Sequence, residues 1–249
     1  MIKVWEITTK LYALKDIKLN YALEQVVYLT DMALIKDERM SVFHNTNIVK
    51  PYVISNVFNV NTKDIRDIKC GSIVSFKIRT ISEEIKNYFL KELPSVQNGY
   101  FKALVSHEIL IPKKHIGMVK TLTPTNVTMS CKDTNKAKYW RDLNVTEEEF
   151  KVSLINNLIH KYFKITGEDF GRVDKNTIGE IVEYIEIKNK YPLYIKYKGI
   201  KLKGDSVEIR FKDNYIAQEL AYFSLGCGIS NKSTRGFGFA NNPKEGKDA

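Results

Sequence analysis

Cysteine is scarce in this sequence. The 249 residues include three, Cys70, Cys131 and Cys227, and no two of them have the CxxC spacing. An odd and scattered set predicts a reducing compartment rather than a disulfide framework, and it argues against a zinc knuckle. We therefore expect a cytoplasmic protein with no metal site and no cofactor.

Long apolar runs are also missing. No stretch approaches the ~20 residues that a membrane-spanning helix needs, so no membrane association is expected. The opening residues IKVWEITTKLYAL alternate like a strand and do not read as a signal peptide. With 43% hydrophobic residues, a chain of this length can form one large domain or two of ordinary size.

Acidic residues are the minority among the charged ones. Lysine and arginine number 39 against 29 aspartates and glutamates, a net charge of +10. A polyanionic partner explains this excess, and nucleic acid is the commonest such partner. General solubility is the competing explanation, and the charge total alone leaves both open.

The first half predicts an alternating series of strands and helices. Strands are expected at 2–13, 52–60, 72–80 and 100–111, with a loop at 39–51. One helix is expected at 20–36, and Ser82 is placed to cap a second, followed by two glutamates in its first turn. The order is that of a ferredoxin-like βαββαβ unit, which we assign to residues 1–115.

The second half, residues 116–249, partly repeats the pattern. A strand at 118–130 is interrupted at Pro124, and Thr146 with Glu149 forms a capping box that opens a helix. Strands follow near 180–188 and 192–203, and a turn at Gly204–Asp205 leads to a strand at 207–211. A last helix from 214 to 225 ends at Gly226, and a short strand closes the unit. The predicted fold class is α+β, with two tandem ferredoxin-like (βαββαβ) domains.

Residues 188–203, KNKYPLYIKYKGIKLK, contain six lysines and no acid. A solvated amphipathic hairpin would explain the polarity, but it would not explain the missing acids. A hairpin that faces phosphates explains both, with lysine supplying charge rather than base identity. The candidate RNA-binding residues here are Lys196, Lys198, Lys201 and Lys203.

Residues 226–239, GCGISNKSTRGFGF, are rich in glycine and carry two cations. Glycine lets a backbone approach a phosphate and present bare N–H groups, whereas a flexible loop near the end of the chain is the plainer interpretation. The segment is neither a dinucleotide fingerprint nor a Walker A loop. Its candidate RNA-binding residues are Gly226, Gly228, Lys232, Arg235, Gly236 and Gly238.

A helix followed by G-x-G, a short basic insert and G-F-G resembles the glycine-rich loop of CRISPR repeat-processing endoribonucleases, within the superfamily of repeat-associated RNA-binding proteins. LTPTNV at 122–127 and HNTNIVKPYVIS at 44–55 are similar as well, so the resemblance covers nearly the whole chain. It implies metal-independent cleavage of CRISPR precursor RNA within its repeats by 2′-hydroxyl attack, leaving 5′-hydroxyl and 2′,3′-cyclic phosphate ends. On the family pattern, the candidate catalytic residues are His44, Lys50 and Tyr28.

The resemblance also implies partners: CRISPR precursor RNA and mature guide RNA, with subunits of a CRISPR effector complex and a second copy of the chain as further expectations. A non-catalytic RNA-binding subunit of an effector complex is the main alternative, and a basic protein-interaction module is the third. Among the other histidines, His107 is expected to pack on a strand, His160 to lie on a helix surface and His115 to belong to a linker.

Overall fold

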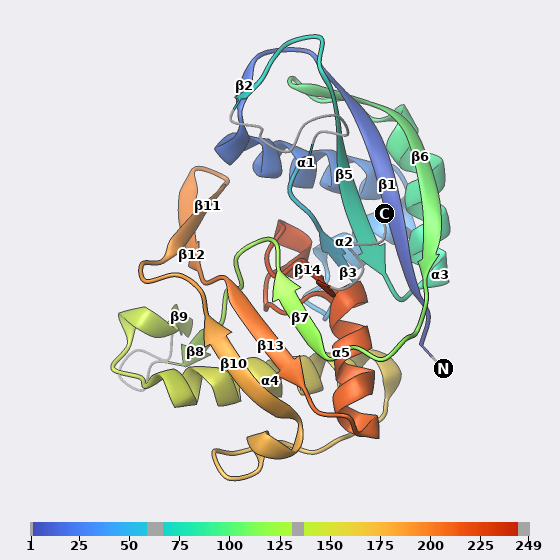
Figure 1. Ribbon diagram of the computed structural model, residues 1–249. Coiled ribbons are helices and arrows are strands. Elements are labelled where there is room, and N and C mark those ends of the chain that lie inside the picture. Colours follow the sequence, from blue (N-terminus) through green and yellow to red (C-terminus); the bar gives the residue numbers. More distant parts are fainter. Residues whose placement is uncertain (1, 59–66, 131–136, 244–249) are drawn as a thin grey trace.

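The computed structural model describes residues 2–58, 67–130 and 137–243 (Figure 1). The first half forms a four-stranded antiparallel sheet in the order β3-β5-β1-β6. Its strands are β1 (Val4–Ala13), β3 (Tyr52–Ile54), β5 (Ile73–Thr80) and β6 (Phe101–Ile111). Helices α1 (Leu19–Leu34) and α3 (Glu83–Glu92) complete a βαββαβ unit, and Ser82 caps α3 as predicted.

A bulge in β6 changes which of its side chains face the helices. The pairing with β1 shifts between Lys10 and Leu11, so that Leu104 lies opposite no residue of β1. Phe101 and Ala103 therefore pack in the first core, whereas Val105 and Ile109 beyond the bulge are exposed. The strand therefore has no single apolar face, and the prediction that His107 packs on it is wrong, because His107 is exposed.

The expected loop at 39–51 contains a helix instead. Helix α2 (Glu38–Asn45) begins after Asp37, whose side chain accepts a hydrogen bond from the Met40 N–H. The strand expected at 52–60 is described only in part: β3 ends at Ile54, Phe58 forms an isolated bridge with Ser75, and the remaining two positions lie outside the described residues. Short strands β2 (Ile17–Lys18) and β4 (Asp67–Ile68) pair beside this sheet.

The second half repeats the topology with the sheet order β10-β13-β7-β14. Its strands are β7 (Met118–Thr121), β10 (Val182–Ile187), β13 (Val207–Phe211) and β14 (Ala240–Asn241), and its helices are α4 (Glu147–Thr166) and α5 (Tyr215–Cys227). The Thr146–Glu149 capping box is present. The apolar stripe of α4 is buried in a second core: Phe150, Leu154, Leu158 and Tyr162. Two ferredoxin-like units are thus confirmed.

Three local predictions in this half are wrong. The segment 192–203 is not one strand but two that pair with each other. Gly204–Asp205 does not turn one strand back on the next, because β12 (Ile200–Gly204) pairs with β11 (Leu193–Tyr197) while β13 joins the main sheet. The tight turn is Lys198–Gly199, where both residues have positive φ angles of 49° and 78°, as a two-residue hairpin turn requires. Helix α5 also continues through Gly226 to Cys227.

The hairpin β11–β12 leaves the second unit and packs on α1 of the first (Figure 1). Ile195 is buried in the first core, and the Lys196 ammonium lies 4.0 Å from the centre of the Tyr21 ring on α1. A further small pair, β8 (Thr128–Ser130) and β9 (Ala137–Tyr139), lies near α4. The short helical turns are Leu93–Ser95, Trp140–Asp142, Ile178–Glu180 and Ser233–Arg235.

The back of the first sheet packs against α5, and polar groups join the two units there. Arg79 is buried and donates to Glu6 at 2.7 Å and to the Ala240 carbonyl at 2.6 Å. The Tyr222 hydroxyl accepts from the Val4 N–H. Burial would raise the pKa of Glu6, but Arg79 and Lys77 outweigh it and lower that pKa. The two units therefore share one continuous interface.

Candidate active site

A cleft of about 630 Å³ lies where the two halves meet. Its walls come from the corner between α1 and α2, the segment 45–50, the turn of the β11–β12 hairpin, helix α4 and the loop 230–235. Among the described residues that line it, one is acidic, Asp31, and five are lysine or arginine: Lys50, Lys161, Lys198, Lys232 and Arg235. The cleft is therefore suited to an anion, with phosphate a natural ligand.

His44 lies in the last turn of α2 and lines this cleft. Its Nδ1 atom is 3.8 Å from Oδ1 of Asp31, which is too long for a hydrogen bond, and Nδ1 has no hydrogen-bond partner among the described residues. Burial raises the pKa of Asp31, although the charges of His44, Lys198 and Arg235 oppose that rise. The carboxylate of Asp31 thus lies beside the Nδ1 edge of the imidazole. The side chain of His44 is 26% exposed, so solvent still reaches part of it.

Lys50 reaches the same cleft from the segment after α2. Its ammonium donates to the Thr46 carbonyl at 2.7 Å and lies 5.3 Å from the centre of the Phe43 ring. Burial lowers the pKa of Lys50. The backbone of 46–50 holds this ammonium on the wall that also carries His44.

Tyr28, the third catalytic candidate, is not brought to the cleft. It lies on α1, is 53% exposed, and is absent from the described residues that line the cavity. Asp31, one helical turn further along α1, occupies the cleft wall instead. The tyrosine that does line the cleft is Tyr197, with the Arg235 guanidinium 5.0 Å and the Lys198 ammonium 5.5 Å from its ring centre.

The glycine-rich loop is a packed structure. Gly226, Gly228, Gly236 and Gly238 are all buried. The N–H groups of the last three donate to the carbonyls of Ser224, Ser233 and Pro124. The expectation that these three glycines present bare N–H groups to phosphate is wrong, since each group already has a partner. A Cβ on Gly226 would come within 2.6 Å of Ile81 on the first unit. The glycines allow close packing, and Lys232 and Arg235 supply the loop's charge.

Lys161 on α4 holds this loop in place through hydrogen bonds. It is buried on α4, and its ammonium donates to the carbonyls of Cys227, Gly228 and Ser230 and to the Ser233 hydroxyl, at 2.5 to 3.3 Å. Burial lowers its pKa to about 8. Sequence reasoning missed this residue, and no local signal marks it, because a lysine beside an apolar stripe normally faces water.

The four hairpin lysines do not share one role. Lys198 lines the cleft and Lys201 is exposed. Lys196 donates to the Tyr21 hydroxyl, and Lys203 forms an ion pair with Asp142 at 2.5 Å. Two of the four predicted RNA contacts are therefore already engaged within the protein.

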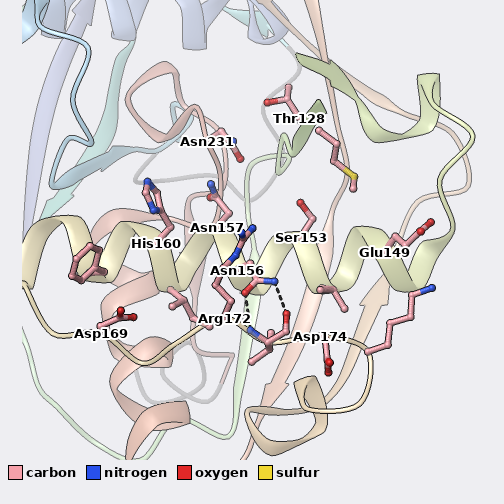
Figure 2. A pocket seen from close by; sticks show the side chains of 16 residues that line it. Thr128, Glu149, Ser153, Asn156, Asn157, His160, Asp169, Arg172, Asp174 and Asn231 are labelled. Carbon is pink, nitrogen blue, oxygen red and sulfur yellow. Dashed lines mark hydrogen bonds between the residues drawn. The ribbon is translucent and has the colours of Figure 1, made fainter. Parts of the chain in front are cut away.

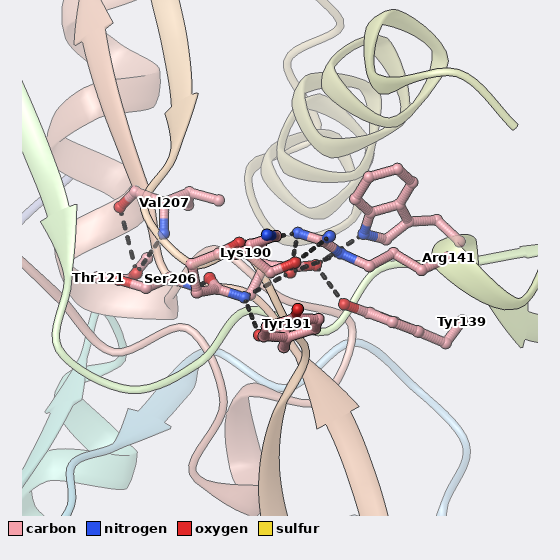
Figure 3. A network of polar contacts seen from close by, with 10 residues as sticks. Thr121, Tyr139, Arg141, Lys190, Tyr191, Ser206 and Val207 are labelled. Carbon is pink, nitrogen blue, oxygen red and sulfur yellow. Dashed lines mark hydrogen bonds and ion pairs between the residues drawn. The ribbon is translucent and has the colours of Figure 1, made fainter.

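A buried carboxylate holds the base of the hairpin in place (Figure 3). Asp205 is fully buried and accepts hydrogen bonds at 2.5 to 3.0 Å from Tyr139, Trp140, Arg141 and Asn189. Arg141 also donates to the carbonyls of Asn189 and Lys190, just before β11. This network fixes the direction in which β11 and β12 leave the second unit, and so the position of Lys198.

The remaining histidines lie in different places. His160 is exposed on α4 as predicted, but it also lines the cleft. His115 is exposed in the junction, and its Nε2 atom lies 3.2 Å from Oδ1 of Asp213.

The described residues offer neither a candidate metal site nor a candidate membrane span. No group of three or more of their His, Cys, Asp and Glu side chains is arranged to hold a metal ion. None of the described helices combines the length and the hydropathy of a membrane span.

Comparison with known families identifies the chain. The family model for the C-terminal part of CRISPR associated protein Cas6 matches residues 107–242, more than half of the sequence. The protein belongs to the Cas6 family. Membership makes CRISPR RNA processing its general role. No curated protein sequence matches it.

Solved structures share the fold over nearly the whole chain. A structure described as CRISPR associated protein Cas6 aligns with a TM-score of 0.70 at 18% identity, covering 96% of this chain and 99% of that one. A repeat-associated protein described as binding different RNA substrates aligns with a TM-score of 0.70 at 21% identity, covering 95% and 98%. A Cas6-related protein from Pyrococcus furiosus gives 0.68 at 19% identity, covering 97% and 99%. At these identities the likeness shows the fold.

Proposed function

We propose that this Cas6 protein is a metal-independent endoribonuclease that cleaves CRISPR precursor RNA within its repeats. The observation that carries the proposal is the position of His44 and Lys50 on the wall of one cationic cleft. A cleft with five cationic side chains and one carboxylate suits an RNA backbone. The imidazole supplies a group that can give or take a proton.

The proposed reaction uses the nucleophile of the RNA itself. A base removes the proton from a 2′-hydroxyl, whose oxygen then attacks the neighbouring phosphorus. The bond from phosphorus to the 5′-oxygen of the next nucleotide breaks, and an acid gives that oxygen a proton. The products are a 2′,3′-cyclic phosphate and a 5′-hydroxyl, so every proton and bond is accounted for without water or metal.

His44 serves as the acid or the base in this scheme, since imidazole performs either role near neutral pH. Lys50 would stabilise the added negative charge on the pentacoordinate phosphorus, with Lys198 and Arg235 holding the flanking phosphates. We assign Asp31 a positioning role, because it faces Nδ1 of His44 and would favour the tautomer that presents Nε2 to RNA. We leave Tyr28 out of this set, because it is not among the described residues that line the cleft.

The test is incubation of the purified protein with single-stranded and hairpin repeat RNA in the presence of a chelator. We expect cleavage at one position, with the two end groups named above. His44→Ala should slow the cleavage step by ~10²–10⁴-fold while RNA binding persists. His107→Ala is the matched control, because that histidine is exposed and lines neither the cleft nor a neighbouring cavity.

Two outcomes would overturn the proposal. Tight binding without cutting would identify a non-catalytic RNA-binding subunit. Weak binding that shows no sequence or structure preference and disappears at moderate salt would identify a basic interaction module instead.

A further inference from the structure

A second cavity of about 880 Å³ runs along α4, next to the active-site cleft (Figure 2). Four residues line both spaces: Thr128, Asn157, His160 and Asn231. We call the second space the α4 groove. One wall is β8, the floor is the outer face of α4, and the other wall is the segment 169–175. An RNA strand that leaves the cleft beside His160 would therefore pass into the α4 groove.

The groove differs from the cleft in its chemistry. Its cationic side chains, Arg172 and Lys175, are matched by Glu149, Asp169 and Asp174, so it carries no cationic excess. These three carboxylates also serve the protein: Glu149 completes the capping box of α4, Asp169 accepts from the Gly171 N–H, and Asp174 accepts from the N–H groups of Asn176 and Thr177. A groove of this kind does not attract a phosphate backbone as the cleft does.

Neutral polar side chains form the floor instead. Ser153 and Asn157 follow one face of α4 at helical spacing, ending at His160, and Figure 2 shows Asn157 and His160 projecting toward Asn231. The amide side chains of Asn157 and Asn231 make no hydrogen bond to the described part of the chain. Amides with both donor and acceptor atoms are the groups that pair with base edges.

The groove is held open by a built contact. Asn156 donates to the Val173 carbonyl at 2.7 Å and accepts from the Val173 N–H at 2.9 Å, which fixes the segment 169–175 to α4. Apolar side chains that are at least partly exposed lie beside the amides and offer surface to base faces: Met129, Val152 and Phe163. From Glu149 to His160 the floor is about 16 Å long, which is enough for a few nucleotides of a single strand.

We infer that the α4 groove binds a single-stranded segment of the RNA beside the scissile phosphate and reads its bases through Asn157 and Asn231. The cleft would hold the backbone and the groove would supply sequence preference, which agrees with single-stranded RNA being read at exposed base edges. This inference rests on the proposed function, since it takes the cleft as the place of cleavage.

The test uses His44→Ala protein and a pool of single-stranded RNAs with a randomised segment, selected for binding and sequenced. We expect a base preference at a few adjacent positions. The added pair Asn157→Ala and Asn231→Ala should lower that preference by roughly 5- to 100-fold at one or two positions, with little change in salt dependence. Asn144→Ala is the control, because Asn144 is exposed and lines neither space.

An unchanged base preference in the double variant, or no preference in the parent protein, would overturn the inference. Failure of the proposed function has a different signature: wild-type protein would bind RNA with a base preference but would not cleave it. Thermal unfolding of the double variant should match that of the Asn144→Ala control, which separates lost reading from lost folding.

Discussion

The carboxylate of Asp31 faces the imidazole of His44 at the corner of α1 and α2, with Oδ1 3.8 Å from Nδ1. The two side chains come from different helices, and the pair lines the cationic cleft. Asp31 also interacts electrostatically with Lys198 from the hairpin, with Arg235 from the glycine-rich loop and with Tyr52. RNA bound in the cleft would engage the two cations and leave Asp31 and His44 to each other.

Asp31→Asn should lower kcat by at least ~10-fold, a part of the ~10²–10⁴-fold contribution of a general acid or base, with little change in KM. The amide cannot stabilise the imidazolium and does not select the tautomer. Burial raises the pKa of Asp31 above 3.8, so the wild-type rate should fall on the acid side as this carboxyl gains a proton, and the variant should lose that limb. A pH–rate profile tests this. Equal loss in kcat and binding at every pH, with a lower melting temperature, would indicate a structural role.

The cations of the cleft should control the salt dependence of RNA binding. Each phosphate contact contributes about 0.7 to the slope of log K against log salt concentration for a single strand. Lys198→Ala and Arg235→Ala should each reduce that slope by about this amount. Lys164→Ala is the matched control, because Lys164 is exposed on α4 and lines neither the cleft nor the groove. An equal slope in all three variants would place the RNA elsewhere.

Much of the fold could be predicted because its signals are local. Strand alternation, the Ser82 cap and the Thr146–Glu149 box all lie within a few residues of the structure that they specify. The bulge in β6 could not be predicted from a local signal. The extra residue, Leu104, reverses which face of the sheet each later side chain of β6 lies on, and no residue type in the strand indicates a bulge. Helix α2 was missed because eight residues with a single buried side chain, Met40, show little periodicity.

The site was predictable to the same extent. His44 and Lys50 follow a sequence pattern, and both line the cleft. Asp31 and Lys161 are distant in sequence from the groups that they contact, so only the packing of α1 and α4 reveals their roles. The same packing explains the glycine-rich loop, whose composition suggested open backbone and whose structure uses that backbone internally.

The buried pair of Arg79 and Glu6 should make the protein sensitive to acid. The pKa of Glu6 is lowered from 4.5, so its contribution to stability is complete above that value and is lost as the pH falls through the folded-state pKa. Arg79→Met should lower the free energy of unfolding by up to ~3–5 kcal/mol, because Glu6 keeps only the partly exposed Lys77 as its ionic partner and the Ala240 carbonyl loses a donor. Glu6→Gln should flatten the acid limb of stability.

Denaturant unfolding measured at several pH values between about 7 and about 3 tests both expectations. Lys69→Met serves as the control, since the ion pair of Lys69 with Asp16 is exposed and contributes little. An acid limb as steep in Glu6→Gln as in the wild type would assign the sensitivity to another carboxyl.

A substitution at Gly238 distinguishes the two interpretations of the glycine-rich loop, which are close packing within the protein and direct contact with RNA. Its φ angle is +68°, and an added Cβ would lie 2.7 Å from the Ile229 carbonyl group, which is backbone and cannot move aside easily. Gly238→Ala should therefore lower the free energy of unfolding by about 2–4 kcal/mol, combining left-handed strain with overpacking. Gly179→Ala is the control, because nothing lies within 4 Å of its Cβ position. RNA affinity of the folded Gly238→Ala protein, measured well below its melting temperature, should remain near the wild-type value. If the variant kept its stability and lost RNA affinity, Gly238 would instead be a residue that contacts RNA.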